Sequence, residues 1–207
     1  MATHKSPADA IAVAIAGAGG GGGTDETTAT LGGAASTWAP VAVSWTANAA
    51  NPPGNTLIQL DSSPAPIKVG CYTFQPAARD LINASHHGDN GRAGGFWLPA
   101  GLTTLRLRMI WGTTATSNGL EAFWRFRMYQ ATADAIYTEA GMTKYEQDSL
   151  TTHTAAVNVG QETTIDITIT GYTATRPVYV TLIRDGTDAS DDLDKATVIW
   201  ALSLECK

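Results

Sequence analysis

Short segments in which apolar and polar residues alternate dominate the chain after residue 101, and they constrain its fold more than any other feature. This period of two is typical of strands that bury one face. Residues that favour turns separate the segments from one another. We therefore predict an all-β protein, with strands at 105–109, 124–128, 165–169, 178–182 and 198–204.

Two further β-prone segments, 56–60 and 67–74, come earlier and are bounded by turns rich in Pro, Gly and Asn. The whole set suggests about eight strands, which suits a jelly roll. The Cys, Trp and Cys spacing of an immunoglobulin domain is missing. We predict a jelly-roll-like antiparallel β-sandwich with a single core over residues 36–207.

A different composition precedes this body and predicts an extended, partly helical N-terminal arm over residues 1–35. Ser6 is a suitable N-cap for a short apolar helix that ends near residue 16, and a glycine-rich stretch follows at 17–23. A helix this short needs a surface to dock on. We predict that its apolar side chains bind a partner: Ala8, Ile11, Val13 and Ile15. A cleaved signal peptide or a plain flexible tail is the alternative.

The charge balance argues against nucleic acid as a partner. The chain has 13 Lys and Arg against 19 Asp and Glu, a net charge of -6, and its basic residues form no run. The apolar part of the arm is shorter than the roughly 20 residues that span a membrane, so no membrane partner is expected. Cys71 and Cys206 have no metal-site spacing, and we predict two buried thiols, with one long-range disulfide as the alternative.

Four arginines occupy the polar positions of segments 105–109 and 124–128, which we interpret as the two strands of a β-hairpin. Its polar face would carry Arg106, Arg108, Arg125 and Arg127. Like charges side by side repel, so this face is either a partner surface or an ordinary outer face. In the second case the arginine stems cover Phe123 and Tyr129, and Asp166 or Glu162 supplies counter-charge.

The sequence contains no recognisable catalytic motif, and we expect neither an enzyme nor a cofactor. His86, His87 and Asp89 fit a solvated turn better than a metal site. Five aspartates follow segment 178–184, and Asp185, Asp188 and Asp191 are the candidates for binding Ca²⁺. A plain connection between two strands explains the same residues and is the favoured interpretation.

The last two strands and the aspartate-rich loop between them resemble the closing hairpin of β-sandwich modules in virion proteins of tailed bacteriophages. The resemblance covers the body from about Leu102 and rests on the general pattern of strands and loop more than on a sequence motif. It implies a capsid decoration, cement or head-fibre protein that docks on the shell through its arm. The implied partners are a capsid or other virion protein and copies of this chain, with a trimer favoured. The implied location is the virion, assembled in the host cytoplasm.

The alternative is a carbohydrate-binding or receptor-binding β-sandwich, either lectin-like or at a phage tail tip. In this interpretation loop tryptophans stack on sugar rings. Trp111 is the predicted stacking platform because it ends its strand, whereas Trp124 and Trp200 fall on apolar strand faces and are predicted to lie in the core.

Overall fold

The computed structural model describes residues 38–59, 68–86, 95–113, 115–117, 119–131, 141–154, 156 and 159–207. The predicted arm lies outside these residues, and with it Ala8, Ile11, Val13 and Ile15. The docking arm therefore stays a prediction. Among the described residues, no helix is long and apolar enough to cross a membrane.

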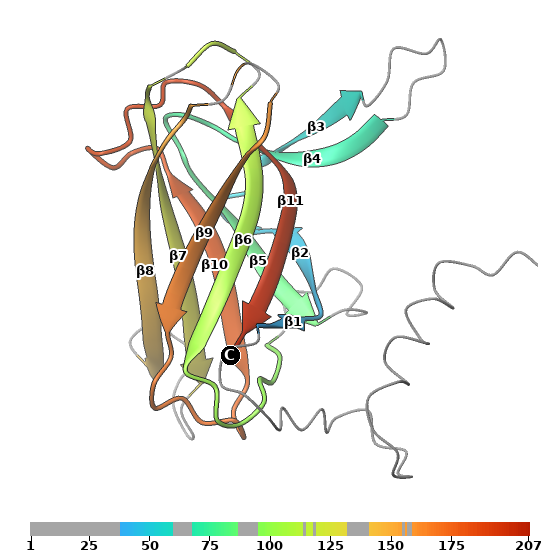
Figure 1. Ribbon diagram of the computed structural model, residues 1–207, viewed down its shortest axis with the longest axis vertical. Coiled ribbons are helices and arrows are strands. Elements are labelled where there is room, and N and C mark those ends of the chain that lie inside the picture. Colours follow the sequence, from blue (N-terminus) through green and yellow to red (C-terminus); the bar gives the residue numbers. More distant parts are fainter. Residues whose placement is uncertain are drawn as a thin grey trace, which may run out of the picture. The chain divides into compact units, whose positions relative to one another are not determined.

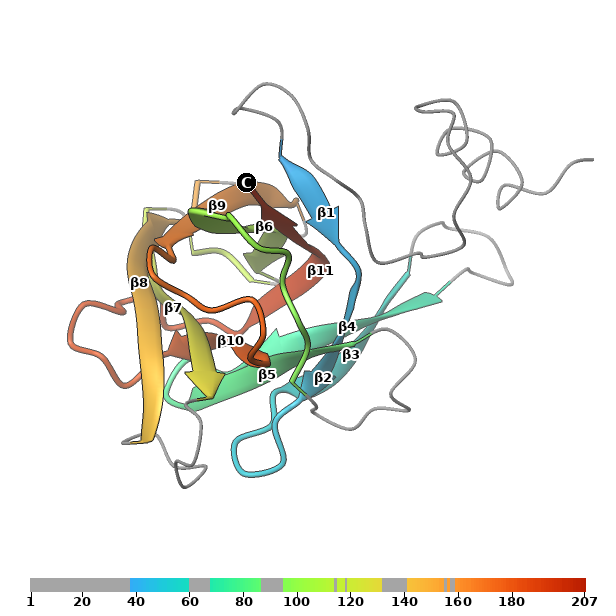
Figure 2. The same ribbon diagram turned by 90° about the horizontal axis from the view of Figure 1, so that it is seen from below.

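Two antiparallel sheets lie face to face and form a sandwich (Figures 1 and 2). The first sheet runs in the order β3–β4–β11–β6–β9, with β1 also paired to β11, and the second runs β2–β5–β10–β7–β8. The strands are β1 (Ala39–Val41), β2 (Val43–Ala47), β3 (Gly54–Gln59), β4 (Lys68–Phe74), β5 (Arg79–His86), β6 (Thr104–Thr113), β7 (Glu121–Ala131), β8 (Met142–Thr152), β9 (Gln161–Thr168), β10 (Val178–Asp185) and β11 (Thr197–Cys206).

The eight strands from β4 onward have the connectivity of a jelly roll. One sheet contains β4, β11, β6 and β9, which are the first, eighth, third and sixth of these strands in chain order. The other contains β5, β10, β7 and β8, which are the second, seventh, fourth and fifth. All neighbouring strands are antiparallel. This wrapping of two four-stranded sheets is the jelly-roll plan, so the predicted fold class is confirmed.

The predicted hairpin of 105–109 and 124–128 is wrong. β6 pairs with β9 and β11 in one sheet, whereas β7 pairs with β8 and β10 in the other. The chain between β6 and β7 crosses from sheet to sheet, so the two apolar faces meet across the core. Alternation shows which side chains of a strand point inward. It does not show whether the next strand pairs with it in the same sheet or packs against it from the other sheet.

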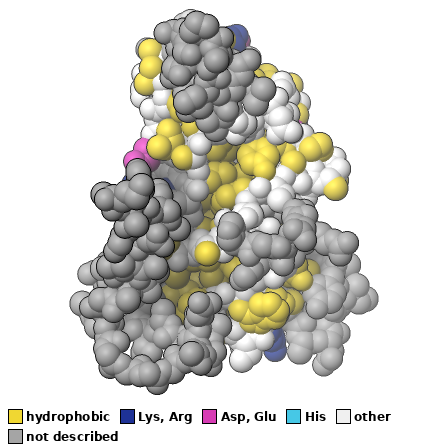
Figure 3. Space-filling model, turned by 90° about the vertical axis from the view of Figure 1, so that its right-hand side faces the viewer, with side chains coloured by type: hydrophobic (Ala, Val, Ile, Leu, Met, Phe, Trp, Pro, Cys, Tyr) yellow, Lys and Arg dark blue, Asp and Glu magenta, His cyan; other side chains and the backbone are white. Residues whose placement is uncertain are grey.

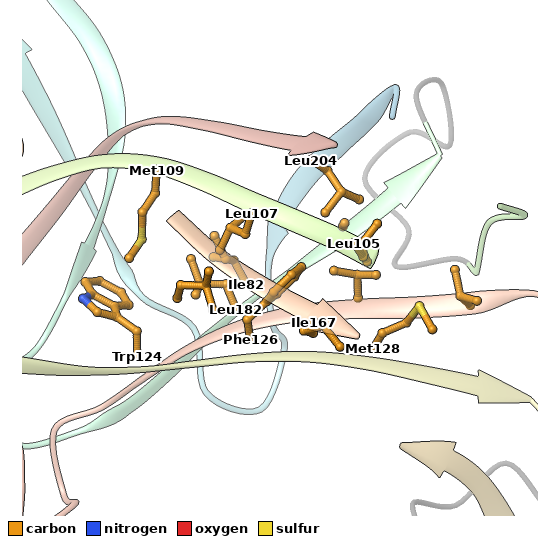
Figure 4. Packing of buried hydrophobic residues seen from close by; sticks show 14 of the residues in the cluster. Ile82, Leu105, Leu107, Met109, Trp124, Phe126, Met128, Ile167, Leu182 and Leu204 are labelled. Atoms are coloured by element: carbon orange, nitrogen blue, oxygen red, sulfur yellow. The ribbon is translucent and has the colours of Figure 1, made fainter. Parts of the chain in front are cut away.

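The core lies between the sheets and consists of side chains from alternate positions of both (Figure 4). Leu105, Leu107 and Met109 of β6 face Trp124 and Phe126 of β7, and each of them is at most 1% exposed. Burying one such side chain contributes about 1.5–3 kcal/mol. Trp111 and Trp124 meet edge to face with ring centroids 5.4 Å apart.

Partly buried apolar residues close one side of the sandwich, where β1 and β2 lie. Val41, Val43 and Trp45 pack against the core there, and the Tyr72 hydroxyl donates a hydrogen bond of 2.6 Å to the Trp45 carbonyl oxygen. Figure 3 views the molecule from this side and shows hydrophobic side chains gathered on its surface.

The two cysteines lie on different strands of the same sheet. Cys71 is on β4 and Cys206 ends β11; both are buried thiols, and no disulfide joins them. Burial raises the pKa of each thiol above its ordinary value. The prediction of two buried thiols is confirmed.

Candidate functional site

The four arginines proposed as one basic face lie on two opposite faces of the sandwich. Arg106 and Arg108 point outward from β6 in the first sheet, and Arg125 and Arg127 point outward from β7 in the second. A single partner surface made of all four is therefore wrong, for the same reason that the hairpin is wrong.

Acidic side chains from the neighbouring strands neutralise the first pair. Arg106 donates two hydrogen bonds of 2.7 Å to the Asp166 carboxylate, and Arg108 donates to Glu162 at 2.6 and 2.9 Å. These bonds raise the pKa of both guanidinium groups. The counter-charges predicted from Asp166 and Glu162 are confirmed.

The second pair is held in the same manner. Arg125 donates to the Asp148 carboxylate at 2.8 and 3.3 Å, which is the main reason why its pKa is raised. Its guanidinium lies 5.1 Å from the Phe123 ring centroid. Arg127 pairs with Glu146 and also donates to the Tyr129 hydroxyl at 3.2 Å. These contacts are those of the predicted ordinary outer face.

The aspartates proposed for Ca²⁺ bind donors within the protein. Asp191 accepts bonds from Arg184 and from the Phe123 backbone amide. Asp185 accepts bonds from Arg125 and from the Thr187 hydroxyl, and Asp188 caps the amide of Ser190. Within the described ranges, no group of three or more His, Cys, Asp or Glu side chains is placed to hold a metal ion.

The histidines do not form a common site in the described structure. The proposed cluster of His86, His87 and Asp89 rests on side chains outside the description. His153 is fully buried, and its Nδ1 lies 3.1 Å from the Ser117 hydroxyl. Burial lowers the pKa of His153, and a hydrogen bond with the Ser117 backbone offsets part of that shift.

The tryptophans lie where the sequence predicts in one case of three. Trp124 is buried in the core as predicted, but Trp111, the predicted stacking platform, is also fully buried and donates to the Thr163 hydroxyl at 2.8 Å. Trp200 was predicted in the core and instead lies half-buried on the outer face of the first sheet. A β-bulge between Ile199 and Ala201 shifts the alternation of β11 and turns the ring outward.

Trp97 is the most exposed large hydrophobic side chain of the described structure. It is 64% exposed, while its neighbours Phe96 and Leu98 are 2% and 3% exposed and belong to the core. Two backbone hydrogen bonds, of 2.8 and 2.9 Å, join Phe96 to Val178 of β10. The two buried neighbours and this bridge hold the backbone on both sides of Trp97, so the indole is presented by a fixed segment.

Two tyrosines and an arginine lie on the same outer side as Trp97. In the bridge between Phe96 and Val178 both side chains point inward, so residues 95, 97 and 179 point outward. A side-chain Cβ at Gly95 would lie 2.9 Å from the Tyr179 ring, which shows how closely that ring approaches the backbone. Tyr179 is directly opposite Tyr129 on β7, and the Tyr129 hydroxyl accepts the bond from Arg127.

We call this group the aromatic surface and define it by Trp97, Tyr129, Tyr179 and Arg127. It combines aromatic ring area with the hydrogen-bonding groups of two phenols and a guanidinium. Sequence reasoning missed Trp97 as a site residue, although one signal was available. Side chains alternate along a strand, so if Phe96 and Leu98 point into the core, Trp97 between them must point outward.

Comparisons with known proteins give a fold likeness and no family. No family model matches the chain, and no curated protein matches it. One similar solved structure is described as arabinose-bound MgGH51 α-L-arabinofuranosidase. It has 14% sequence identity and a TM-score of 0.42, and the match covers 82% of this chain and 23% of that one.

A second similar structure is described as TmCBM61 in complex with β-1,4-galactotriose. It has 11% identity and a TM-score of 0.34, and the match covers 82% of this chain and 88% of that one. Neither structure is described as a virion protein. At these scores the likeness is restricted to the β-sandwich.

Proposed function

We propose that this β-sandwich is a carbohydrate-binding module that holds its ligand on the aromatic surface. The observation that supports the proposal most is the exposure of Trp97 between two core residues. The exposed indole leaves apolar ring area in contact with water, so a ligand that covers this ring would gain free energy.

The chemistry of the aromatic surface suits a sugar ring. An indole face offers flat apolar area to the C–H face of a pyranose or furanose. Tyr179 lies directly opposite Tyr129 on the same outer face, and phenol groups are hydrogen-bonding groups of the kind that bind sugar hydroxyls. Because Arg127 is paired with Glu146, the surface carries little net charge, which favours neutral glycans.

A glycan microarray tests this proposal, with wild-type protein, Trp97→Ala and Leu150→Ala. Leu150 is the matched control because it is also a large exposed apolar residue, at 44%, and lies on β8. We expect binding of neutral oligosaccharides that falls at least about tenfold in Trp97→Ala, as for an aromatic anchor residue. Leu150→Ala should bind as wild type does. Equal binding of neutral oligosaccharides by Trp97→Ala and Leu150→Ala would contradict the proposal.

A second candidate function is a virion structural protein, and the jelly-roll strand order is the observation that favours it. Both viral capsid domains and lectin domains use this fold. In this proposal the chain is a capsid decoration, cement or head-fibre protein, a homotrimer that docks on the shell through Ile11, Val13 and Ile15. Each of these side chains would contribute about 1.5–3 kcal/mol if fully buried.

Co-sedimentation with empty phage shells tests the second candidate. The full-length protein should sediment with the shells, and a chain without residues 1–35 should stay in the supernatant. Equal behaviour of the two chains would rule out docking through the arm. The two candidates are compatible, since a module at a phage tail tip would recognise a glycan receptor.

A further inference from the structure

The outer face of the first sheet carries a hollow that is separate from the aromatic surface. It has a volume of about 140 Å³ and lies over β6, β9 and β11. Its lining consists of Arg108, Met109, Ile110, Glu162, Ala201, Leu202 and Ser203. Ala201 and Ser203 contribute only small side chains to this lining, beside the longer side chains of Arg108 and Ile110 on the neighbouring strand β6.

The bulge in β11 lies next to the hollow, because Ala201 ends the bulge and also lines the hollow. It places two successive residues, Trp200 and Ala201, on the outer side of the strand. The Trp200 ring then packs over two glycines: a Cβ at Gly160 would lie 2.3 Å from the ring, and one at Gly112 would lie 3.0 Å from it. The same Cβ at Gly160 would lie 2.6 Å from a methyl group of Ile110, so Trp200 and Ile110 are close neighbours over this glycine.

The groups around the hollow offer both hydrogen-bond donors and acceptors beside an apolar wall. Ile110 is 41% exposed and supplies the apolar side, while Ser203 supplies a hydroxyl. Arg108 stands at the rim between two acids, since it pairs with Glu162 at 2.6 Å and with Glu205 at 3.5 Å. The two carboxylates outweigh its single positive charge, so an anionic ligand is disfavoured.

We propose that this hollow is a second binding site for one ring of a neutral sugar. The inference rests on the proposed function and extends it by a second site. The hollow and the aromatic surface lie on opposite outer faces of the sandwich. One molecule would therefore hold two glycan chains at once, and binding to a surface dense in glycans would gain from both sites. Bulges are frequent next to binding sites, where they redirect side chains, as this one does for Trp200.

An NMR titration separates the two sites. The probes are cellotriose, maltotriose and mannotriose, with trigalacturonic acid as the anionic counterpart. The Trp97 indole N–H reports on the aromatic surface, and the backbone amides of Ala201 and Ser203 report on the hollow. We expect at least one neutral trisaccharide to shift both sets of signals, and trigalacturonic acid to leave the Ala201 and Ser203 amides unchanged.

Two substitutions assign each shift to its site. Ser203→Leu fills the hollow and should weaken the response of the Ala201 amide at least about tenfold, while the Trp97 signal still moves. Thr168→Leu is the control, since Thr168 is an exposed residue of the same sheet that does not line the hollow. No response at Ala201 and Ser203, with a normal response at Trp97, would overturn the second site alone. A response only at the hollow would instead overturn the aromatic surface.

Discussion

The buried ion pair between Arg184 and Asp191 gives the sharpest prediction about stability. Their side chains are 0% and 1% exposed. Asp191 accepts bonds of 3.1 and 2.9 Å from the guanidinium and one of 3.0 Å from the Phe123 amide. Arg184 also donates to the carbonyl oxygens of Leu193 and Lys195, so the pair fixes the whole connection between β10 and β11.

The Asp191→Ala substitution leaves the Arg184 charge buried without its acid. Removing one partner of a buried pair costs about 3–5 kcal/mol. In a domain of this size each kcal/mol lowers Tm by about 2–4 °C, so we expect a drop of about 6–20 °C. Urea unfolding at pH 7 measures the change in unfolding free energy, and an unchanged m value would show that both proteins unfold the same surface.

Asp194→Ala is the matched control in the same loop. Asp194 pairs with Lys195, but its side chain is 63% exposed, and such pairs contribute less than about 1 kcal/mol. Equal losses of unfolding free energy in Asp191→Ala and Asp194→Ala would show that burial of the ion pair does not set its contribution to stability. Adding Ca²⁺ or EDTA should leave Tm unchanged; a rise in Tm with Ca²⁺ would revive the metal interpretation of the aspartates.

Three further predictions follow from single sites. Gly160→Ala should lower the unfolding free energy by about 1–3 kcal/mol, because the new methyl group collides with Trp200. Gly70→Ala is the control, since nothing lies within 4 Å of its new methyl group, and it should leave the unfolding free energy unchanged or raise it slightly. Urea titration measures both. Because burial lowers the pKa of His153, the unfolded chain binds the proton more readily. Stability should therefore fall as pH drops below about 6.5, and Tm against pH should be flatter in His153→Gln. Trp97→Ala should change unfolding free energy by less than about 0.5 kcal/mol, so that a loss of glycan binding is not a loss of fold.

The sequence predicts the inward residues well because burial and alternation are local properties of a strand. Leu105, Trp124 and Ile165 all point into the core as their spacing indicates. The jelly-roll class and the buried thiols follow from the same kind of local evidence, but the strand count does not, since the described residues form eleven strands and about eight were predicted. The counter-charges for Arg106 and Arg108 were also predictable, because exposed arginines on a sheet need acids on neighbouring strands.

The errors concern contacts between distant parts of the chain. Pairing partners are decided by the packing of two sheets, so the pattern in β6 and β7 did not show that they lie in different layers. The outward Trp200 ring depends on space provided by Gly112 of β6 and by Gly160, which directly precedes β9. The exposure of Trp97 depends on a bridge to Val178, far along the chain. Sequence alone placed Trp111 at a surface because nothing local shows that other strands cover it.

Isothermal titration calorimetry measures whether the aromatic surface binds carbohydrate and how much Trp97 contributes to the affinity. The ligand is the oligosaccharide bound most strongly on the microarray, and the proteins are wild type, Trp97→Ala and Leu150→Ala. We expect Trp97→Ala to bind at least about tenfold more weakly, which is about 1.4 kcal/mol, and Leu150→Ala to match wild type. Equal affinities for all three proteins would contradict this expectation.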